Sequence, residues 1–173
     1  KVFEIIEAKK IFNISYKKIS ILVHSKSYVH AIIKFKNGLT KLVVHDTNMK
    51  IPISNSLYSS SKFINSKKLD FRILNNLDFK FIDCKRFPVT KILNILPDKS
   101  SLFENILVSS NDKLVELFLN KKIKFTDIQK ILFKVINYRE FKKLKLKKPK
   151  NIKEINNLNK IVNSKINKIV YKM

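Results

Sequence analysis

The chain has 173 residues, of which 45% are hydrophobic, and its 37 Lys and Arg against 13 Asp and Glu give a formal net charge of +24. No apolar run approaches the roughly 18 residues that a membrane span needs, and the opening residues lack the pattern of a signal segment, so we expect no membrane partner. A chain of this length can bury a core without disulfides, and the single Cys84 indicates a reducing compartment.

The basic charge has two possible origins. Lys, Ile and Asn can be encoded by codons of A and T alone, whereas Gly, which needs G, occurs once. Arg, which nucleic-acid sites favour for its planar bidentate fork, occurs only at Arg72, Arg86 and Arg139. We therefore interpret the charge as the mutational bias of an A+T-rich genome, with a phosphate-binding face as the alternative, and we expect no specific nucleic-acid partner.

The first residues predict a helix from Val2 to Phe12 with apolar positions nearly all round it, typical of a helix packed on most sides. Lys1 and Glu4, one helical turn apart, fall on an otherwise apolar stripe with Ala8, Ile11 and Phe12. A structural salt bridge between Lys1 and Glu4 is the simplest interpretation. Because the helical pattern already includes Lys1, where a complete chain would have Met, we expect the chain to be part of a longer protein.

Three strands rich in Ile and Val are predicted at Ile19–His24, Val29–Phe35 and Leu39–His45. Asn37 and Gly38 lie between the last two and predict a hairpin with a type I′ turn, because both residue types tolerate positive φ. After Pro52 the chain becomes polar, and a short strand-like stretch follows at Leu77–Ile82. We interpret this region as a linker or an outer strand.

From Phe87 onward the apolar period is helical. Ser101-x-x-Glu104 and Thr126-x-x-Gln129 have the spacing of capping boxes. The segments that follow carry apolar faces and predict a small helical bundle, with the faces formed by Ile128, Ile131, Leu132, Val135, Ile136 and by Ile152, Ile155, Leu158, Val162, Ile166, Ile169. The lysines between Lys142 and Lys150 are interpreted as a solvated connection.

The residues capable of chemistry are few. A phosphate loop needs several glycines and a cysteine metal site needs paired cysteines, and neither pattern occurs. His24, His30 and His45 each lie at or near the end of a predicted strand. A single histidine in such a place is more often a structural residue than a catalyst.

Seven segments in order resemble a known family: KVFEIIEA, VHSKSYVH, FKNG, NMKIPI, LDF, RFP and FLNKKIKFTDI, which begin at Lys1, Val23, Phe35, Asn48, Leu69, Arg86 and Phe118. They are similar to the C-terminal part of 1-deoxy-D-xylulose-5-phosphate reductoisomerase. The similarity extends over nearly the whole chain and fades after about Tyr138. The combination of Lys-x-x-Glu, His-x-x-Ser-x-x-His and FTDI is specific, although each piece alone is weak.

The resemblance implies an α+β fold in which a partial mixed sheet with a hairpin and a packed helix is followed by a C-terminal helical bundle. It places the end of the catalytic domain at residues 1–60, a linker with a short strand at 61–85 and the bundle at 86–173. The family's N-terminal, Rossmann-like NADPH domain would be absent from this chain. The expected location is the cytoplasm of a bacterium, or alternatively a plastid-type organelle.

The implied function is the conversion of 1-deoxy-D-xylulose 5-phosphate to 2-C-methyl-D-erythritol 4-phosphate with NADPH and Mg²⁺ or Mn²⁺, in a complete enzyme that is a homodimer. By motif match, Glu4 is a metal ligand and Lys1 binds the substrate phosphate. Ser27 and His30 line the substrate pocket, with His30 also catalytic, and Met49 lies beside the nicotinamide. A carboxylate suits a hard, oxygen-preferring cation.

Several departures from the family pattern bear on activity. Ser25 replaces a proline, His45, Thr47 and Asn48 replace a glycine, a proline and an aspartate, and an Asn-Ala-Ala-Asn-Glu run is VSSND at Val108–Asp112. Two further metal carboxylates and other phosphate ligands are expected before Lys1, so the chain alone should be inactive. The alternative function is a degenerate, non-catalytic remnant that acts as a dimerisation or weak polyanion-binding module.

Overall fold

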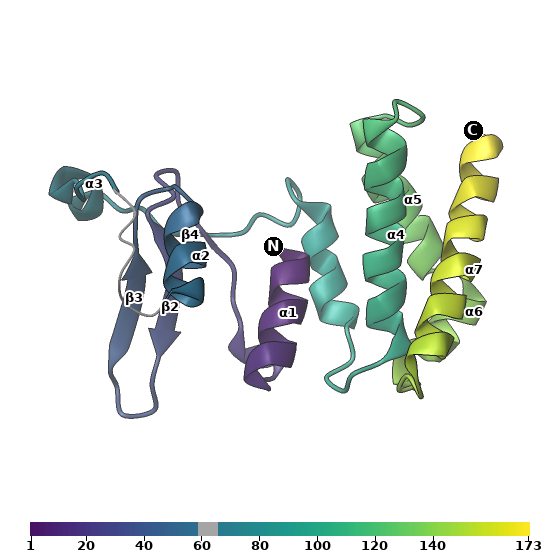
Figure 1. Cartoon of the computed structure of the whole chain (residues 1–173), viewed down its shortest axis with the longest axis horizontal. Helices are drawn as coiled ribbons and strands as arrows, with labels where there is room; N and C mark the ends of the chain where they lie inside the picture. Colours follow the sequence, from purple (N-terminus) through teal and green to yellow (C-terminus); the bar gives the residue numbers. More distant parts are fainter. Residues whose placement is uncertain (59–65) are drawn as a thin grey trace. The chain divides into compact units, whose positions relative to one another are not determined.

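The computed structural model describes residues 1–58 and 66–173, which form two compact units (Figure 1). The bundle unit comprises Lys1–Ile21 and Asp83–Met173, and the hairpin unit comprises Leu22–Ile82. In the described residues, no helix combines the length and apolar character that crossing a bilayer requires. The α+β class is confirmed.

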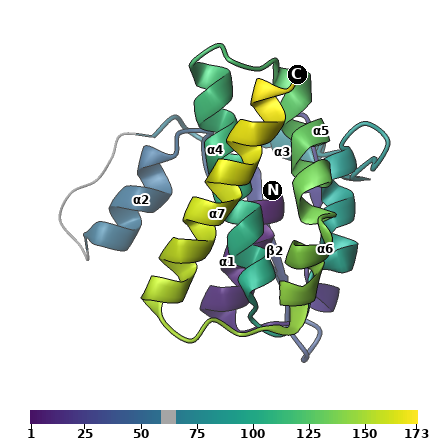
Figure 2. The ribbon, with the colours of Figure 1, turned by 90° about the vertical axis from the view of Figure 1, so that its right-hand side faces the viewer.

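The bundle unit is built around one long helix, α4 (Leu102–Leu119), which contacts α5 (Phe125–Ile136) and α7 (Ile152–Tyr171) (Figures 1 and 2). The remaining elements are shorter and lie along the chain as α1 (Val2–Phe12), η1 (Tyr16–Lys18), η2 (Pro88–Ile95), α6 (Arg139–Lys142) and η3 (Lys143–Leu146). The predicted bundle is therefore confirmed.

The core of the bundle unit lies along α4. Phe103, Ile106, Leu107 and Leu114 are fully buried there. The apolar face predicted for α5 is confirmed by buried Ile131, Leu132, Val135 and Ile136, and that of α7 by buried Leu158, Val162, Ile166 and Ile169. On α7 the face begins later than predicted, since Ile152 is exposed.

Helix α1 has the predicted bounds, but the prediction that it packs on most sides is wrong. Its buried residues are Val2, Ile5 and Ile6, which form one stripe, whereas Ile11 and Phe12 are 65% and 69% exposed. The helix meets its own unit along η2, so only one stripe of its surface is covered.

Of the two predicted helix starts, one is confirmed and one is wrong. Ser101 is the N-cap of α4, and Glu104 Oε2 accepts a hydrogen bond from the Ser101 backbone N–H at 3.5 Å, as predicted. Helix α5 instead begins after Lys124, so the start predicted at Thr126 is wrong. The carboxylate of Asp127 accepts the Lys124 N–H at 3.0 Å, which stabilises a first turn two residues earlier.

The lysine-rich connection is more ordered than predicted. It contains the end of α6 and all of η3, and the Lys147 carbonyl accepts the N–H of Leu102 at 2.8 Å. Lys147 Nζ also pairs with Glu154 Oε1 at 2.6 Å. These contacts fix the connection against the start of α4 and the first turn of α7.

The hairpin unit contains two small antiparallel sheets, where we expected one mixed sheet. One pairs β1 (Leu22–Val23) with β4 (Lys80–Phe81), and the other pairs β2 (Val29–Lys34) with β3 (Thr40–Val44). The unit also contains two helices that were not predicted. Helix α2 (Lys50–Leu57) precedes the predicted linker, and α3 (Phe71–Asn75) lies within it. None of the unit's described residues is buried.

The turn between β2 and β3 confirms the predicted hairpin but not its turn type. Gly38 has a φ of +86°, and it is the position in this loop with positive φ. Its N–H donates to Phe35 O at 3.2 Å, while Phe35 N–H donates to Leu39 O at 2.8 Å. This pattern fits a three-residue loop with a left-handed glycine, because a type I′ turn would also require positive φ at Asn37.

The division into units differs from the predicted domain boundaries. Helix α1 belongs with the bundle, because Val2 and Ile6 join its core cluster. Part of the predicted linker, residues 61–65, lies outside the described residues. The chain returns to the bundle unit at Asp83, and the next residue, Cys84, is an exposed thiol whose Sγ lies 3.5 Å from Thr90 Oγ1.

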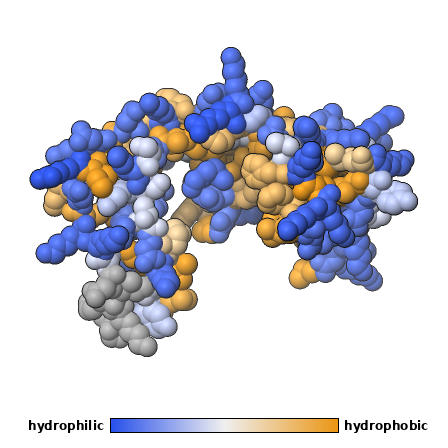
Figure 3. Space-filling view, turned by 90° about the horizontal axis from the view of Figure 1, so that it is seen from above, coloured by the Kyte–Doolittle hydropathy of each residue, from blue (hydrophilic) through white to orange (hydrophobic). Residues whose placement is uncertain are grey.

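Hydrophobic and hydrophilic side chains both reach the surface. In the space-filling view (Figure 3), hydrophobic patches lie between hydrophilic ones. The large hydrophobic side chains that are more than 70% exposed include Phe71, Phe81, Phe125 and Leu146. Scattered exposed apolar residues are ordinary in folded proteins.

Candidate functional site

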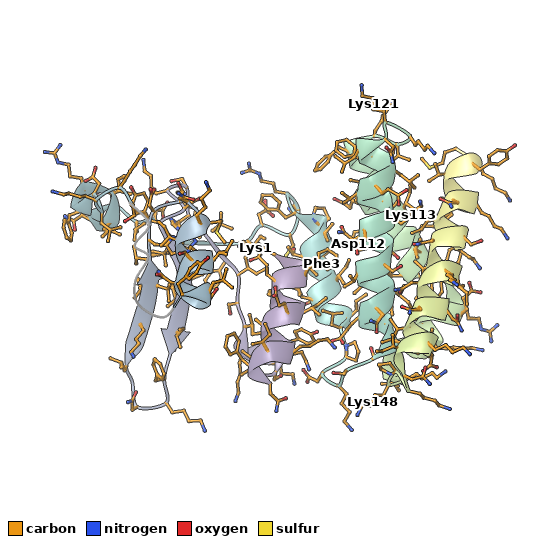
Figure 4. The ribbon with its side chains drawn as sticks, in the orientation of Figure 1. Lys1, Phe3, Asp112, Lys113, Lys121 and Lys148 are labelled. Atoms are coloured by element: carbon orange, nitrogen blue, oxygen red, sulfur yellow. The ribbon has the colours of Figure 1, made fainter. Side chains whose placement is uncertain are left out.

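The two charged residues of the predicted stripe stand at the N-terminal end of α1, where Figure 4 labels Lys1. Lys1 Nζ lies 2.7 Å from Glu4 Oε2, and the two side chains are 65% and 62% exposed. The structure therefore brings these residues together as a solvated ion pair one turn apart. Such exposed pairs contribute about 0–1 kcal/mol to stability.

Glu4 has the charge state that a metal ligand needs. The hydrogen bond from Lys1 lowers the pKa of the Glu4 carboxyl below its usual value, although partial burial opposes the shift. Glu4 is thus an exposed carboxylate at neutral pH. Within residues 1–58 and 66–173 no cluster of three or more His, Cys, Asp or Glu could hold a metal ion.

Ser27 lies in the turn that leads into β2. Its φ of +55° is in the left-handed region, which non-glycine residues seldom occupy. The turn is closed by His24, whose Nε2 lies 3.0 Å from Val29 O and 3.3 Å from Val29 N. His24 therefore has the structural role that we predicted for a histidine in this position, and it fixes the loop that presents Ser27.

His30 occupies an irregularity in the hairpin. Val29 pairs with Val44 and Ala31 with Val43, so His30 is an extra residue on β2, a β-bulge. Bulges redirect side chains and are common beside functional sites. The His30 ring stacks on that of His45, with centroids 3.6 Å apart and planes 5° from parallel.

Met49 is the residue before the first turn of α2, and its side chain is 58% exposed. Its φ and ψ of −65° and −13° are already helical. An unbranched thioether in this position can adapt to a flat ring placed against it. Ser27, His30 and Met49 all belong to the hairpin unit, whereas Lys1 and Glu4 belong to the bundle unit.

Sequence reasoning missed a buried carboxylate in the bundle unit. The side chain of Glu104 is 3% exposed and pairs with Lys10 Nζ at 2.6 Å, while Tyr16 Oη donates to its Oε1 at 2.7 Å. Burial, together with this hydrogen bond, raises the pKa of Tyr16. The sequence pattern indicates Glu104 only as a cap, because its partners Tyr16 and Lys10 lie far away along the chain.

The VSSND run lies within α4, where Val108 and Asp112 are exposed and Ser109 and Ser110 are buried. Figure 4 labels Asp112 and Lys113 there, beside a polar hollow of about 270 Å³ that both residues line. Ser109 Oγ donates to Asn163 Oδ1 of α7 at 3.4 Å, and the Oγ of Ser110 is buried without a hydrogen-bond partner. The run therefore helps to join two helices of the bundle.

This architecture is found in solved structures. It matches 1-deoxy-D-xylulose 5-phosphate reductoisomerase from Zymomonas mobilis in complex with NADPH, with 25% identity, a TM-score of 0.79 and coverage of 96% of this chain and 43% of that one. A structure of DOX-P reductoisomerase with NADPH, fosmidomycin and magnesium has a TM-score of 0.82 at 24% identity, covering 97% of this chain and 42% of that one. The fold is that of a reductoisomerase segment.

Sequence comparison gives the same family. Residues 45–165 match the model of the DXP reductoisomerase C-terminal domain, and the chain belongs to this family. The reductoisomerase of Pelagibacter ubique is 62% identical over 167 residues, or 96% of this chain and 43% of the relative. The reductoisomerase of a Sulfurihydrogenibium species is 34% identical, over 83% of this chain and 39% of the relative. The chain thus spans less than half the length of these relatives.

Proposed function

We propose that this chain is the C-terminal part of an NADPH-dependent reductoisomerase that converts 1-deoxy-D-xylulose 5-phosphate to 2-C-methyl-D-erythritol 4-phosphate. The observation that carries the proposal is the 62% identity to the Pelagibacter ubique reductoisomerase across 96% of the chain. The homodimer and the cytoplasmic location stay predictions.

Glu4 is the residue that would bind the metal. Its exposed, ionised carboxylate is a hard oxygen donor, the ligand type of Mg²⁺ and Mn²⁺, so its chemistry fits. The bound cation would polarise oxygens of the substrate. Because Mg²⁺ is commonly held by one or two carboxylates with waters and substrate oxygens, one carboxylate from this chain is enough when the others come from elsewhere in the protein.

Lys1 would bind the substrate phosphate. Its ammonium is 65% exposed and already held by a carboxylate oxygen, which a phosphate oxygen can replace. A cation held by Glu4 would compete with Lys1 for the carboxylate, which would leave the ammonium available to the phosphate. Exchange of one exposed ion pair costs little, since the pair contributes so little in water.

His30, Ser27 and Met49 would act on the organic part of the reaction. The imidazole of His30 can donate a hydrogen bond to a substrate oxygen or transfer a proton near neutral pH. The hydroxyl of Ser27, presented by the turn that His24 closes, can donate to a substrate oxygen. Met49 would lie against the nicotinamide of NADPH.

The test is turnover by the full-length protein, measured as NADPH consumption with the sugar phosphate and Mg²⁺ or Mn²⁺. Glu4→Gln keeps the shape of the side chain and removes its charge. We expect turnover to fall by on the order of 100-fold or more, since a preorganised charge at a reacting centre contributes this much. The melting temperature should change little, because the Lys1 to Glu4 pair is exposed.

Glu7→Gln is the matched control, since Glu7 is also exposed on α1, three residues further along. This variant should retain the activity of the unmodified protein. Lys1→Met should raise the KM for the substrate more than it lowers kcat, with Lys18→Met as its control. A full-length protein without turnover would contradict the proposal and favour the non-catalytic dimerisation or polyanion-binding module.

A further inference from the structure

We propose that His45 is a positioning residue for His30: its ring and backbone together hold the His30 imidazole in one orientation. This inference rests on the proposed function, in which His30 acts on substrate. It concerns a residue at which this chain departs from the glycine that the family resemblance implies, so the arrangement is a property of this sequence.

The restraint is needed because His30 is exposed at a bulge. An exposed histidine samples several staggered rotamers, and no regular strand pairing fixes a bulged residue. In this structure the His30 ring instead lies flat on His45, with a centroid separation of 3.6 Å and an interplanar angle of 5°. A flat stack at this distance favours this rotamer over those that turn the ring away.

His45 can act as a platform because it is itself anchored. Its side chain is half-buried, and its Nδ1 lies 2.6 Å from the carbonyl oxygen of Asp46. Since a carbonyl only accepts, Nδ1 carries a proton in this contact, which fixes both the ring orientation and the tautomer. The backbone N–H of His45 also donates to Tyr28 O at 3.2 Å, which fixes the end of β3 beside β2.

The backbone of His45 adds a second restraint. Nε2 of His30 lies 3.4 Å from the carbonyl oxygen of His45. The contact is long for a hydrogen bond, so it favours a protonated Nε2 only weakly and restrains the ring less than the stack does. A residue with any side chain supplies this carbonyl, whereas only a flat ring supplies the stack. The two contributions can therefore be separated by substitution.

The experiment compares His45→Ala, which removes the ring, with His45→Phe, which keeps a flat ring without nitrogens. In the full-length protein we expect His45→Ala to lower kcat about tenfold with little change in KM, since misplacement of a reacting group costs rate. His45→Phe should remain within about threefold of the unmodified protein. Lys41→Ala, on the same exposed hairpin but opposite Ile33 in the ladder, is the control.

Nuclear magnetic resonance of the same proteins, labelled at histidine, reads the stack directly. The His30 Cε1–H signal should carry a ring-current shift in the unmodified protein and in His45→Phe, and lose it in His45→Ala. An unchanged kcat and signal in His45→Ala would overturn the proposal, as would equal losses of kcat in both variants. If the unmodified protein has no turnover, the proposed function fails, while dependence of the signal on the ring still supports the positioning of His30.

Discussion

Every buried hydrophobic residue among those that the structure describes lies in the bundle unit, and none lies in the hairpin unit. The hairpin is instead held by its β2 to β3 ladder and by local turn contacts such as His24 to Val29. Ser27, His30 and Met49, proposed to meet the organic part of the substrate and the nicotinamide, belong to this second unit, whereas Lys1 and Glu4 belong to the bundle unit. The buried core therefore lies in one unit, whereas three of the five proposed site residues lie in the unit without a core.

This comparison predicts the largest difference between isolated fragments. A peptide of residues 83–173 contains α4, α5 and α7 and should show a helical circular dichroism spectrum with a cooperative thermal transition. A peptide of residues 22–82 should show no cooperative transition and should associate, because its strand edges are unpaired. A monomeric, cooperatively folding hairpin peptide would break the comparison.

Single substitutions should reproduce the difference on a smaller scale. Phe103→Ala removes a fully buried ring and should lower the free energy of unfolding by about 3–5 kcal/mol. Phe81→Ala, in the hairpin unit, removes a ring that is 82% exposed and should cost about 0.5 kcal/mol or less. Denaturant titration of both variants measures these values. Similar losses in the two variants would show that the hairpin unit has a core of its own.

Removing the charge of the buried carboxylate of Glu104 should have an intermediate effect on stability. Glu104→Gln removes the charge that pairs with Lys10 and weakens the acceptor of the Tyr16 hydroxyl, which should cost about 1–3 kcal/mol. Glu140→Gln is the control, because Glu140 pairs with Lys165 but is 52% exposed, and it should cost less than about 1 kcal/mol. Chemical unfolding measures the stability of the two variants. Equal losses of unfolding free energy would contradict a structural role for the buried network.

The smallest effect is expected at the proposed metal ligand. The pKa of Glu4 is lowered in the folded state, so its contribution to stability is present above the unfolded value of 4.5 and is lost as pH falls through the folded value. Because the pair is exposed, the loss should be below about 0.5 kcal/mol. The test compares the free energy of unfolding of Lys1→Met with that of the unmodified protein, as the pH falls from above 4.5 through the folded pKa of Glu4. A large pH-dependent difference would mean that Glu4 serves the fold.

The sequence was most informative where one physical rule acts locally. The bounds of α1 and the buried faces of α5 and α7 follow from helical periodicity. Helix α2 was missed because the residues after Pro52 are polar and predicted a linker, although proline is tolerated in the first turn of a helix, where it stands here. The turn at Gly38 was assigned to the wrong type, since the same Asn-Gly pair fits loops of two lengths.

The candidate site was less predictable for a related reason. The Lys1 to Glu4 contact follows from helical spacing, but the roles of both residues came only from the family resemblance. The stack of His30 on His45 depends on a bulge that shifts the strand register, and Glu104 meets Tyr16 across 88 residues of chain. Neither contact leaves a local pattern in the sequence.

The position of Cys84 makes the chain convenient for spectroscopy. It is the one cysteine in 173 residues, its thiol is exposed, and it lies two residues after the hairpin unit ends at Ile82. A fluorescent or spin label can therefore be attached at a unique point beside the junction of the two units, without first removing other thiols. Such a label would report the local mobility of the chain beside that junction.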